Sequence, residues 1–287
     1  MDEGTISAET PKLLQAIPAN RSYESVRHHF EIERAIAARL KAADRPARKQ
    51  IYSTMYDELF AQVPDHPRLT RRDDAALTER VNRSKLRLLQ PFARDDADFL
   101  EFGAGDCRFA FAMAKRFRHV YAVDIANQIG TAVQPPANFS LTVYDGYDLA
   151  LPDASIDLAF SDQLIEHLHP DDTVHHFRLV HRLLKSGGLY LLRTPHRLTG
   201  PHDVSRYFCE TAECFHLKEW TYGELAATIE SLGFSSVRAY WFGKGILLRL
   251  PRGLFSTIEA AFDGGPLGIR RRVLPYLVPG VVIAAVK

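Results

Sequence analysis

The stretch DFLEFGAGDCRFA, residues 98–110, constrains the fold of this chain more than any other. A short apolar run ends at Glu101, glycines follow at Gly103 and Gly105, and an apolar pattern with helical spacing then begins. This order predicts a strand, a tight turn and a helix. A second apolar run, HVYAVDI, contains Asp124 near its end. In doubly wound sheets an acid at this place, beside a glycine turn, binds the ribose of a nucleoside.

Further apolar runs follow, separated by similar lengths of chain. Strands are expected at these residues: 98–102, 119–125, 139–146, 156–163, 189–195, 235–242 and 280–287. Helical patterns separate most of them, which predicts an α/β fold with a doubly wound, mostly parallel sheet and right-handed crossovers.

The motif E-F-G-A-G-D-C resembles the E/D-x-G-x-G-x-G motif of class I S-adenosylmethionine (SAM)-dependent methyltransferases, with Cys107 at the place of the last glycine. The stretches 151–172, 194–208 and 215–234 are also similar to small-molecule members of that family. The resemblance covers roughly residues 95–245. It implies a Rossmann-like, seven-stranded sheet whose last strand is antiparallel, SAM as cofactor, and methyl transfer to a small molecule.

The resemblance also implies which residues hold the cofactor. Glycines and strand-end acids make up most of the set: Glu101, Gly103, Gly105 and Cys107 near the methionine part, Asp124 and Ile125 at the ribose, Asp145 and Gly146 at the adenine, and Ser161 and Asp162 at the methionine end. A carboxylate accepts several hydrogen bonds, so Asp124 is expected to take both ribose hydroxyls.

Histidines point to the chemistry, because eight of the twelve lie between His167 and His216, after the expected fourth and fifth strands. Ligands of open parallel sheets bind beyond the carboxyl ends of the strands. We therefore expect His167, His196 and His202 as candidate catalytic residues that deprotonate the acceptor, which favours transfer to oxygen over nitrogen. His176 is expected outside the buried face of its helix.

Four further residues are candidates for substrate binding: Tyr52, Tyr56, Arg206 and Tyr207. The pair Glu166-His167 resembles the end of the E-x-x-E-H motif with which ubiquinone-biosynthesis O-methyltransferases can hold a divalent metal. Gln163 stands where that motif has its first glutamate, and a neutral amide is a weaker ligand for a hard cation. No metal is therefore expected.

The chain divides into three parts by pattern. Residues 1–20 are polar and are expected to form a mobile tail, 21–93 a helical N-terminal cap with a loop at PDHPRL, and 94–287 the SAM-binding domain, with an insertion near 246–278.

Composition narrows the function classes. The net charge of +1 gives no general basic field for nucleic acid. The three cysteines form no metal-binding spacing, the first residues lack the apolar core of a signal peptide, and no run approaches the roughly 18 apolar residues of a membrane span. A cytoplasmic enzyme without stable membrane insertion or a nucleic-acid partner is expected.

Two other interpretations remain open. An NAD-dependent oxidoreductase needs a third glycine where Arg108 stands. A cofactor-binding regulatory protein that has lost turnover keeps the same acids and glycines. A nucleic-acid methyltransferase is disfavoured, because no N/D-P-P-Y/F motif follows the expected fourth strand.

Overall fold

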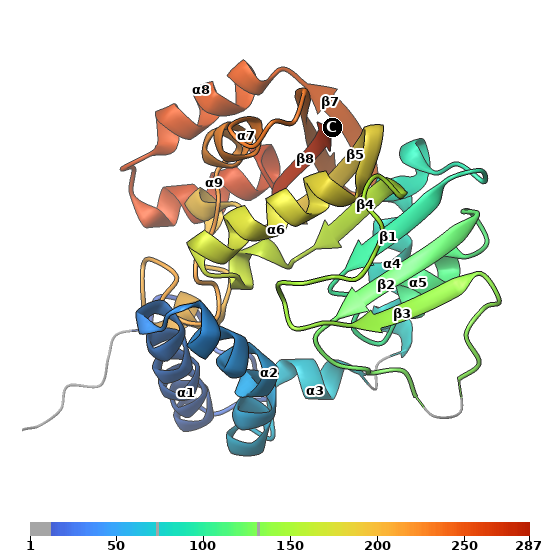
Figure 1. Cartoon of the computed structure of the whole chain (residues 1–287). Helices are drawn as coiled ribbons and strands as arrows, with labels where there is room; N and C mark the ends of the chain where they lie inside the picture. Colours follow the sequence, from blue (N-terminus) through green and yellow to red (C-terminus); the bar gives the residue numbers. More distant parts are fainter. Residues whose placement is uncertain (1–12, 73–74, 131–132) are drawn as a thin grey trace, which may run out of the picture.

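The computed structural model describes residues 13–72, 75–130 and 133–287 and contains an eight-stranded sheet of order β3-β2-β1-β4-β5-β8-β6-β7 (Figure 1). The strands are β1 Asp98–Phe102, β2 His119–Asp124, β3 Phe139–Val143, β4 Ile156–Asp162, β5 Leu184–Thr194, β6 Ser236–Gly243, β7 Ile246–Leu250 and β8 Val281–Val286. Strands β3, β2, β1, β4 and β5 are parallel, and β8 pairs antiparallel with both β5 and β6. The predicted α/β fold with its antiparallel last strand is confirmed.

The sheet has eight strands where seven were expected. Lys244 and Gly245 have φ angles of 52° and 79°, so the chain reverses in a two-residue hairpin turn after β6. The residues 246–250, expected to begin an insertion, therefore pair with β6 as the edge strand β7.

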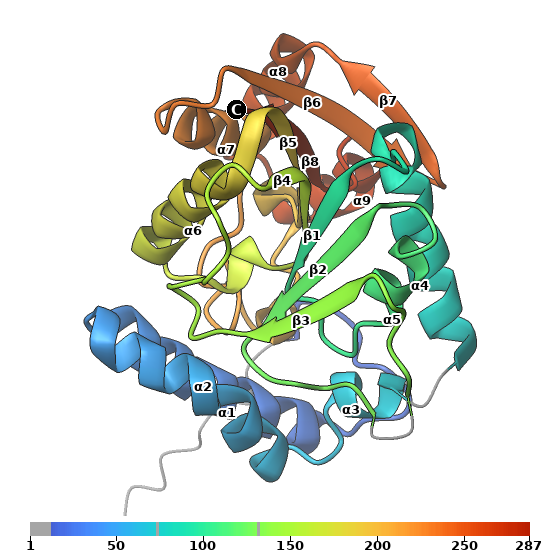
Figure 2. The same cartoon turned by 45° about the vertical axis from the view of Figure 1, so that its right-hand side comes forward.

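Helices cover both faces of the sheet (Figures 1 and 2). They are α4 Ala75–Leu89 and α5 Arg108–Met113 on one face, and α6 Pro170–Leu183, α7 Tyr222–Glu230, α8 Arg252–Phe262 and α9 Leu267–Leu277 on the other. Side chains alternate along β1, so Phe99 packs into the core beneath α5 while Leu100 and Phe102 pack into the core beneath α6. Both cores are buried, which holds the carboxyl ends of the central strands in fixed register.

The N-terminal helices lie beyond the carboxyl ends of the parallel strands (Figure 2). They are α1 Tyr23–Ala42, α2 Arg45–Gln62 and α3 Pro67–Arg72. Asp44 caps α2 by accepting a hydrogen bond from the amide of Ala47, so the Arg45-Pro46 pair begins this helix at once after α1. The segment PDHPRL was expected to be a loop, but its second half belongs to α3. Short 3₁₀ helices complete the chain: η1 Gln90–Phe92, η2 Ile165–His167, η3 Arg197–Thr199 and η4 Val204–Tyr207.

Residues 1–12 of the expected tail lie outside the described residues. Leu14 donates a backbone hydrogen bond to Tyr207, and Ile17 packs against the buried cluster around Phe30. In the expected insertion, α8 packs on α7 through the stacked rings of Tyr222 and Phe255, whose centroids are 3.9 Å apart. No described helix is long and apolar enough to cross a bilayer.

Candidate active site

The glycine turn after β1 presents backbone to open space beside Asp124. Gly103, Gly105 and Cys107 have φ angles of 70°, 56° and 60°, the left-handed region that favours glycine. The amide of Gly105 donates to Oδ2 of Asp124 at 2.7 Å, and no atom lies within 4 Å of the place where a Cβ of Gly105 would stand. The turn and the acid of the next strand thus form one unit with room above it.

Asp124 keeps the acceptor capacity that a ribose needs. Its Oδ1 accepts from the amide of Ala126 at 3.3 Å, and its Oδ2 accepts from Gly105. An ionised carboxylate has about four acceptor positions, so each oxygen retains one for a hydroxyl. The side chain is otherwise buried, and Ile125 beside it is half-buried.

Asp145 is engaged more fully than the sequence suggested. Its Oδ1 accepts from the amides of Tyr147 and Asp148 at 2.8 and 2.9 Å, and its Oδ2 pairs with Lys49 Nζ of α2 at 2.5 Å. Burial opposes ionisation, but Lys49 and the two amides lower the pKa of Asp145 to about 2. Gly146, with φ 89°, again faces open space. A ligand beside Gly146 would therefore contact an acid that is already paired with Lys49 of α2.

Glu101 lies in a buried set of charges at the ends of β1, β4 and β5. Lys85 Nζ of α4 is 3.4 Å from Oε1 of Glu101 and 3.7 Å from Asp162. Oε2 of Glu101 is buried and has no hydrogen-bond partner. Burial raises the pKa of Glu101 to about 7, although Lys85 acts in the opposite direction. A buried oxygen without a partner is available to a donor on a ligand.

Ser161 and Asp162 are held by β5. The hydroxyls of Ser161 and Tyr190 are 2.6 Å apart, and Arg193 donates two hydrogen bonds, of 2.6 and 2.7 Å, to Asp162. Both side chains are therefore occupied, and their contribution to a ligand site is to fix the end of β4.

Arg68 was missed by the sequence analysis. It lies on α3, with its guanidinium 4.7 Å from the ring centroid of Tyr56. Tyr56 raises the pKa of Arg68, and burial lowers it. The carboxylates of Asp124 and Glu33 raise this pKa further, so the net shift is upward. The same cation contributes to lowering the pKa of His167. Arg68 therefore places a positive charge within electrostatic reach of both Asp124 and His167, and Pro67 at the helix start was the available signal.

The three candidate histidines differ in what their rings can do. His167 donates from Nδ1 to the carbonyl of Phe215 at 3.0 Å, because a carbonyl only accepts. Burial above all, and then the charges of His216 and Arg68, lower the pKa of His167 to about 3, so the ring is neutral. Among the described residues, Nε2 of His167 has no hydrogen-bond partner.

His196 does not fit a catalytic role. It is fully buried, its Nδ1 accepts from the amide of Leu198, and its Nε2 bonds Glu259 of α8 at 2.9 Å. His202 bonds the hydroxyl of Thr199 through Nε2 at 2.8 Å, and burial lowers its pKa. Among the three candidate histidines, Nε2 of His167 and Nδ1 of His202 therefore have no hydrogen-bond partner in the described part of the chain.

A surface hollow also lies at the opposite edge of the sheet, at the amino ends of the parallel strands. It measures about 320 Å³ and is lined by residues at the amino ends of β1, β4 and β5, including Ala97, Asp157 and Lys185. Ligands of such sheets bind at the carboxyl ends, where the glycine turn and the acids described above gather.

Comparison with known proteins agrees with this geometry. Residues 100–192 match the model of a methyltransferase domain family. Residues 100–192 thus carry a methyltransferase domain. It is 31% identical over 140 residues to a probable SAM-dependent methyltransferase of Mycolicibacterium smegmatis, covering 48% of this chain and 51% of that one. A protein of Mycobacterium tuberculosis with the same description is 31% identical over 141 residues, with 49% of each chain covered.

Solved structures support the fold of this methyltransferase domain. A SAM-dependent methyltransferase from Archaeoglobus fulgidus superposes with a TM-score of 0.50 at 18% identity, covering 72% of this chain and 94% of that one. A putative methyltransferase of Haloferax volcanii, solved with the Trm112 activator, gives a TM-score of 0.51 at 13% identity, covering 75% and 93%. The chain spans about half the length of the curated relatives it matches.

Tyr52 serves to attach the N-terminal helices to the methyltransferase domain. Its hydroxyl accepts from the amide of His169 at 2.8 Å and donates to Asp172 of α6 at 3.1 Å. Arg48 donates two hydrogen bonds, of 2.7 and 2.8 Å, to the same carboxylate, and Tyr147 donates one of 2.9 Å. Tyr52 is 6% exposed and has no free face for a substrate.

The remaining candidate substrate residues fall into two groups. Tyr56 lies under Arg68 and packs edge-to-face on Phe215. Arg206 donates to the backbone carbonyls of His202 and Asp203, and Tyr207 packs beside the cluster around Phe30. Tyr56 stays a candidate, whereas Arg206 and Tyr207 stabilise the loop after β5.

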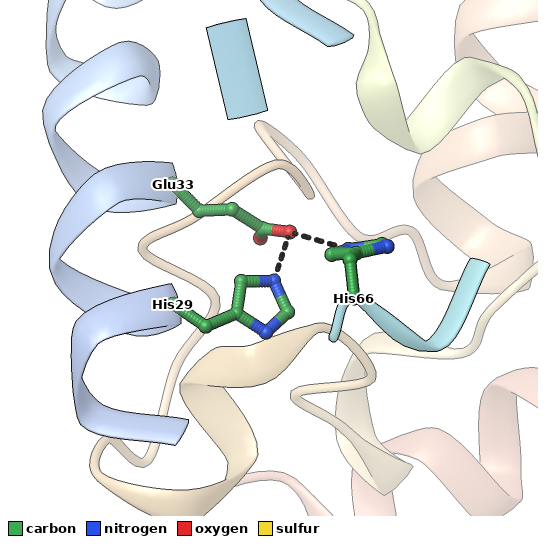
Figure 3. Close-up of side chains that lie close together, drawn as sticks. All are labelled: His29, Glu33 and His66. Atoms are coloured by element: carbon green, nitrogen blue, oxygen red, sulfur yellow. Dashed lines mark hydrogen bonds and ion pairs between the residues drawn. The ribbon is translucent and has the colours of Figure 1, made fainter. Parts of the chain in front are cut away.

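A cluster of His29, Glu33 and His66 has the residue types of a metal site but the wrong protonation (Figure 3). Arg21 donates to Nδ1 of His29 at 3.0 Å, and the amide of Arg68 donates to Nδ1 of His66 at 3.1 Å. Each ring therefore directs an Nε2 proton at Oε1 of Glu33, 2.7 and 3.5 Å away. A metal needs those lone pairs, so the two rings are not oriented for an ion, although Oε2 of Glu33 is buried without a hydrogen-bond partner.

Proposed function

We propose that this chain transfers the methyl group of SAM to a hydroxyl of a small-molecule acceptor. The observation that carries the proposal is the hydrogen bond from Gly105 to Asp124, which joins the glycine turn to the ribose-binding acid beside open space. The positive charge of Arg68 interacts with Asp124 of this unit and also with Tyr56 and His167. Cofactor and acceptor groups therefore meet under one cap.

Each cofactor group has a residue of matching chemistry. Asp124 accepts from the ribose hydroxyls, and Asp145 and Gly146 lie at the adenine. Oε2 of Glu101 is the unpartnered acceptor for the ammonium of the methionine part. The turn from Gly103 onward supplies backbone that a side chain would obstruct.

The transfer is an in-line displacement. The acceptor oxygen forms a bond to the methyl carbon, the carbon–sulfur bond breaks with its electrons going to sulfur, and the hydroxyl proton passes to Nε2 of His167 and from there to solvent. The protein supplies alignment and exclusion of water. His167 is neutral, so its free Nε2 accepts the hydrogen bond of the hydroxyl and orients it. His202 is the second candidate for this contact.

A labelled-SAM assay tests the proposal. The protein is incubated with SAM labelled in the methyl group and a fractionated metabolite extract, and the products are identified by mass spectrometry. We expect a methyl ether of a small molecule and S-adenosylhomocysteine in equal amounts. SAM binding without product across fractions would favour a binding protein that has lost turnover. Binding of a nicotinamide cofactor in place of SAM would contradict the proposal outright.

A further inference from the structure

The helix α9 presents apolar side chains to solvent. Ile269 is 53% exposed, Val273 is also exposed, and Tyr276, at 77%, is the most exposed large apolar side chain in the described part of the chain. Their spacing of four and three residues places all three on one face of the helix. A monomer rarely gathers several such side chains in one place unless a partner covers them.

Three consecutive arginines, Arg270, Arg271 and Arg272, lie on the same helix, which contains no acidic residue. Arg272 is exposed, whereas Nε of Arg270 and Nε of Arg271 are buried without a hydrogen-bond partner. Among the described residues, none of the three arginines belongs to an ion pair. Burial, with the charges of Arg206 and Arg270, lowers the pKa of Arg271 against the opposing effect of two glutamates. The positive charge on α9 is therefore incompletely balanced by the rest of the protein.

We propose that α9 docks this protein on the surface of an anionic lipid bilayer. Ile269, Val273 and Tyr276 enter the boundary between headgroups and acyl chains, and the arginines contact lipid phosphates. Docking in this plane needs no spanning helix, and α9, with 11 residues, is too short to span. The proposal goes beyond methyl transfer and does not depend on it.

The chemistry of α9 favours a bilayer over other occupants. A second copy related by a two-fold axis would bring the arginines of both helices together with no acid on either helix to separate them. Nucleic acid offers phosphates, but its backbone has no apolar layer to receive Ile269, Val273 and Tyr276. An anionic bilayer offers phosphates and acyl chains at adjacent depths, and tyrosine is enriched at that boundary.

Docking through α9 also places the loop after β5. The helix packs beside η3 of this loop, and Nη2 of Arg271 donates to the carbonyl of Arg206 in η4 at 3.5 Å. The same loop carries His202, a candidate for the acceptor contact. A docked α9 therefore holds this loop near the lipid headgroups.

Vesicle binding by the full chain tests the proposal without SAM or an acceptor. The protein is sedimented with vesicles of phosphatidylcholine alone and with vesicles that also contain phosphatidylglycerol. We expect binding to the second kind only, weakened by added salt. Arg272→Glu should bind about fivefold or more weakly, because each basic side chain contributes to attraction near an anionic surface. The double variant Ile269→Ser/Tyr276→Ser should bind about tenfold or more weakly, because it loses two buried apolar side chains.

The edge strand β7 supplies matched controls. Ile246 is 56% exposed, close to the value of Ile269, and Leu248 and Arg249 are exposed on the same strand. Ile246→Ser/Leu248→Ser and Arg249→Glu remove side chains of the same kinds from another surface. Both controls should bind anionic vesicles as the unaltered protein does.

Several results would overturn the docking surface. They are no sedimentation with anionic vesicles, equal binding to neutral and anionic vesicles, and α9 variants that bind as their β7 controls do. A dimer in light scattering that is lost in Ile269→Ser/Tyr276→Ser would assign the face to a second copy instead. Circular dichroism checks the fold of each variant. Should the double variant fail to fold, Arg272→Glu, which alters an exposed side chain, decides the question.

Discussion

Cys107 adopts a backbone conformation that glycine reaches at lower cost. Its φ of 60° lies in the left-handed region, which costs an L-residue about 1–2 kcal/mol. The side chain is fully buried, and its Sγ contacts the carbonyl of Gly105. This explains why a cysteine stands in a turn whose motif has glycine: packing of the thiol offsets the strain.

Substitution of Cys107 tests that balance. Cys107→Gly relieves the strain and loses the buried side chain, worth about 1–2 kcal/mol, so we expect a free energy of unfolding within about 1 kcal/mol of the unaltered protein. Cys107→Val, which is β-branched, should lose at least about 2 kcal/mol. Urea denaturation measures both. Equal losses in the two variants would show that backbone conformation is not the deciding term.

The surroundings of a candidate residue could be predicted where a local pattern marks it. Asp124 at a strand end and Gly105 in a glycine turn were expected side by side, and the Gly105 amide donates to Asp124. The surroundings of His196 and His176 were not predicted: the first is engaged by Glu259 of α8 and the second, 2% exposed, by the hydroxyl of Tyr190 on β5. These partners are brought in by packing, which no local pattern indicates.

A buried carboxylate is one of the attachments of the N-terminal helices to the sheet domain. Asp172 of α6 accepts four hydrogen bonds, from Arg48, Tyr52 and Tyr147. Arg48 is buried and depends on this partner. Placement of α2 over the carboxyl ends of the strands therefore depends on α6 as well as on the Lys49–Asp145 pair and the apolar contacts of Phe215.

Removal of the Asp172 carboxylate should lower the free energy of unfolding strongly. Asp172→Ala leaves the Arg48 charge buried and unpaired, which costs about 3–5 kcal/mol of unfolding free energy. Asp171→Ala, one residue earlier and exposed, is the matched control and should cost less than about 1 kcal/mol. Denaturant unfolding compares them, and hydrogen exchange reports whether α1 and α2 open first. Similar losses in both variants would contradict the assignment.

The α1 helix also carries a predicted acid sensitivity. Burial opposes ionisation of Glu33, but hydrogen bonds from His29 and His66 lower its pKa to about 2 from an ordinary value of 4.5. A depressed pKa stabilises the fold above the ordinary value and loses that contribution as the pH falls toward 2. The melting temperature of the unaltered protein should therefore exceed that of Glu33→Gln more at pH 5.5 than at pH 3. A difference that stays constant would contradict the assignment.

At the scale of the whole molecule, hydrophobic periodicity predicted the parallel sheet and its order of elements, and the resemblance to methyltransferases implied the antiparallel last strand. It did not predict the eighth strand, because the turn at Lys244 and Gly245 is short and the residues beyond it are partly exposed. It also did not predict that α3 would carry Arg68 toward the site, since a six-residue helix gives almost no periodic signal.

The central claim is that the glycine turn and Asp124 bind SAM. Calorimetry with S-adenosylhomocysteine, on the unaltered protein and on Asp124→Ala, tests it most directly. The variant loses hydrogen bonds to a charged acceptor, each worth roughly 1.5–3 kcal/mol, so two of them predict a loss of affinity of about a hundredfold or more. Asp96→Ala, an exposed acid at the opposite edge of the sheet, is the control and should bind normally. Affinity of Asp124→Ala within about threefold of the unaltered protein, with its fold intact, would contradict the claim.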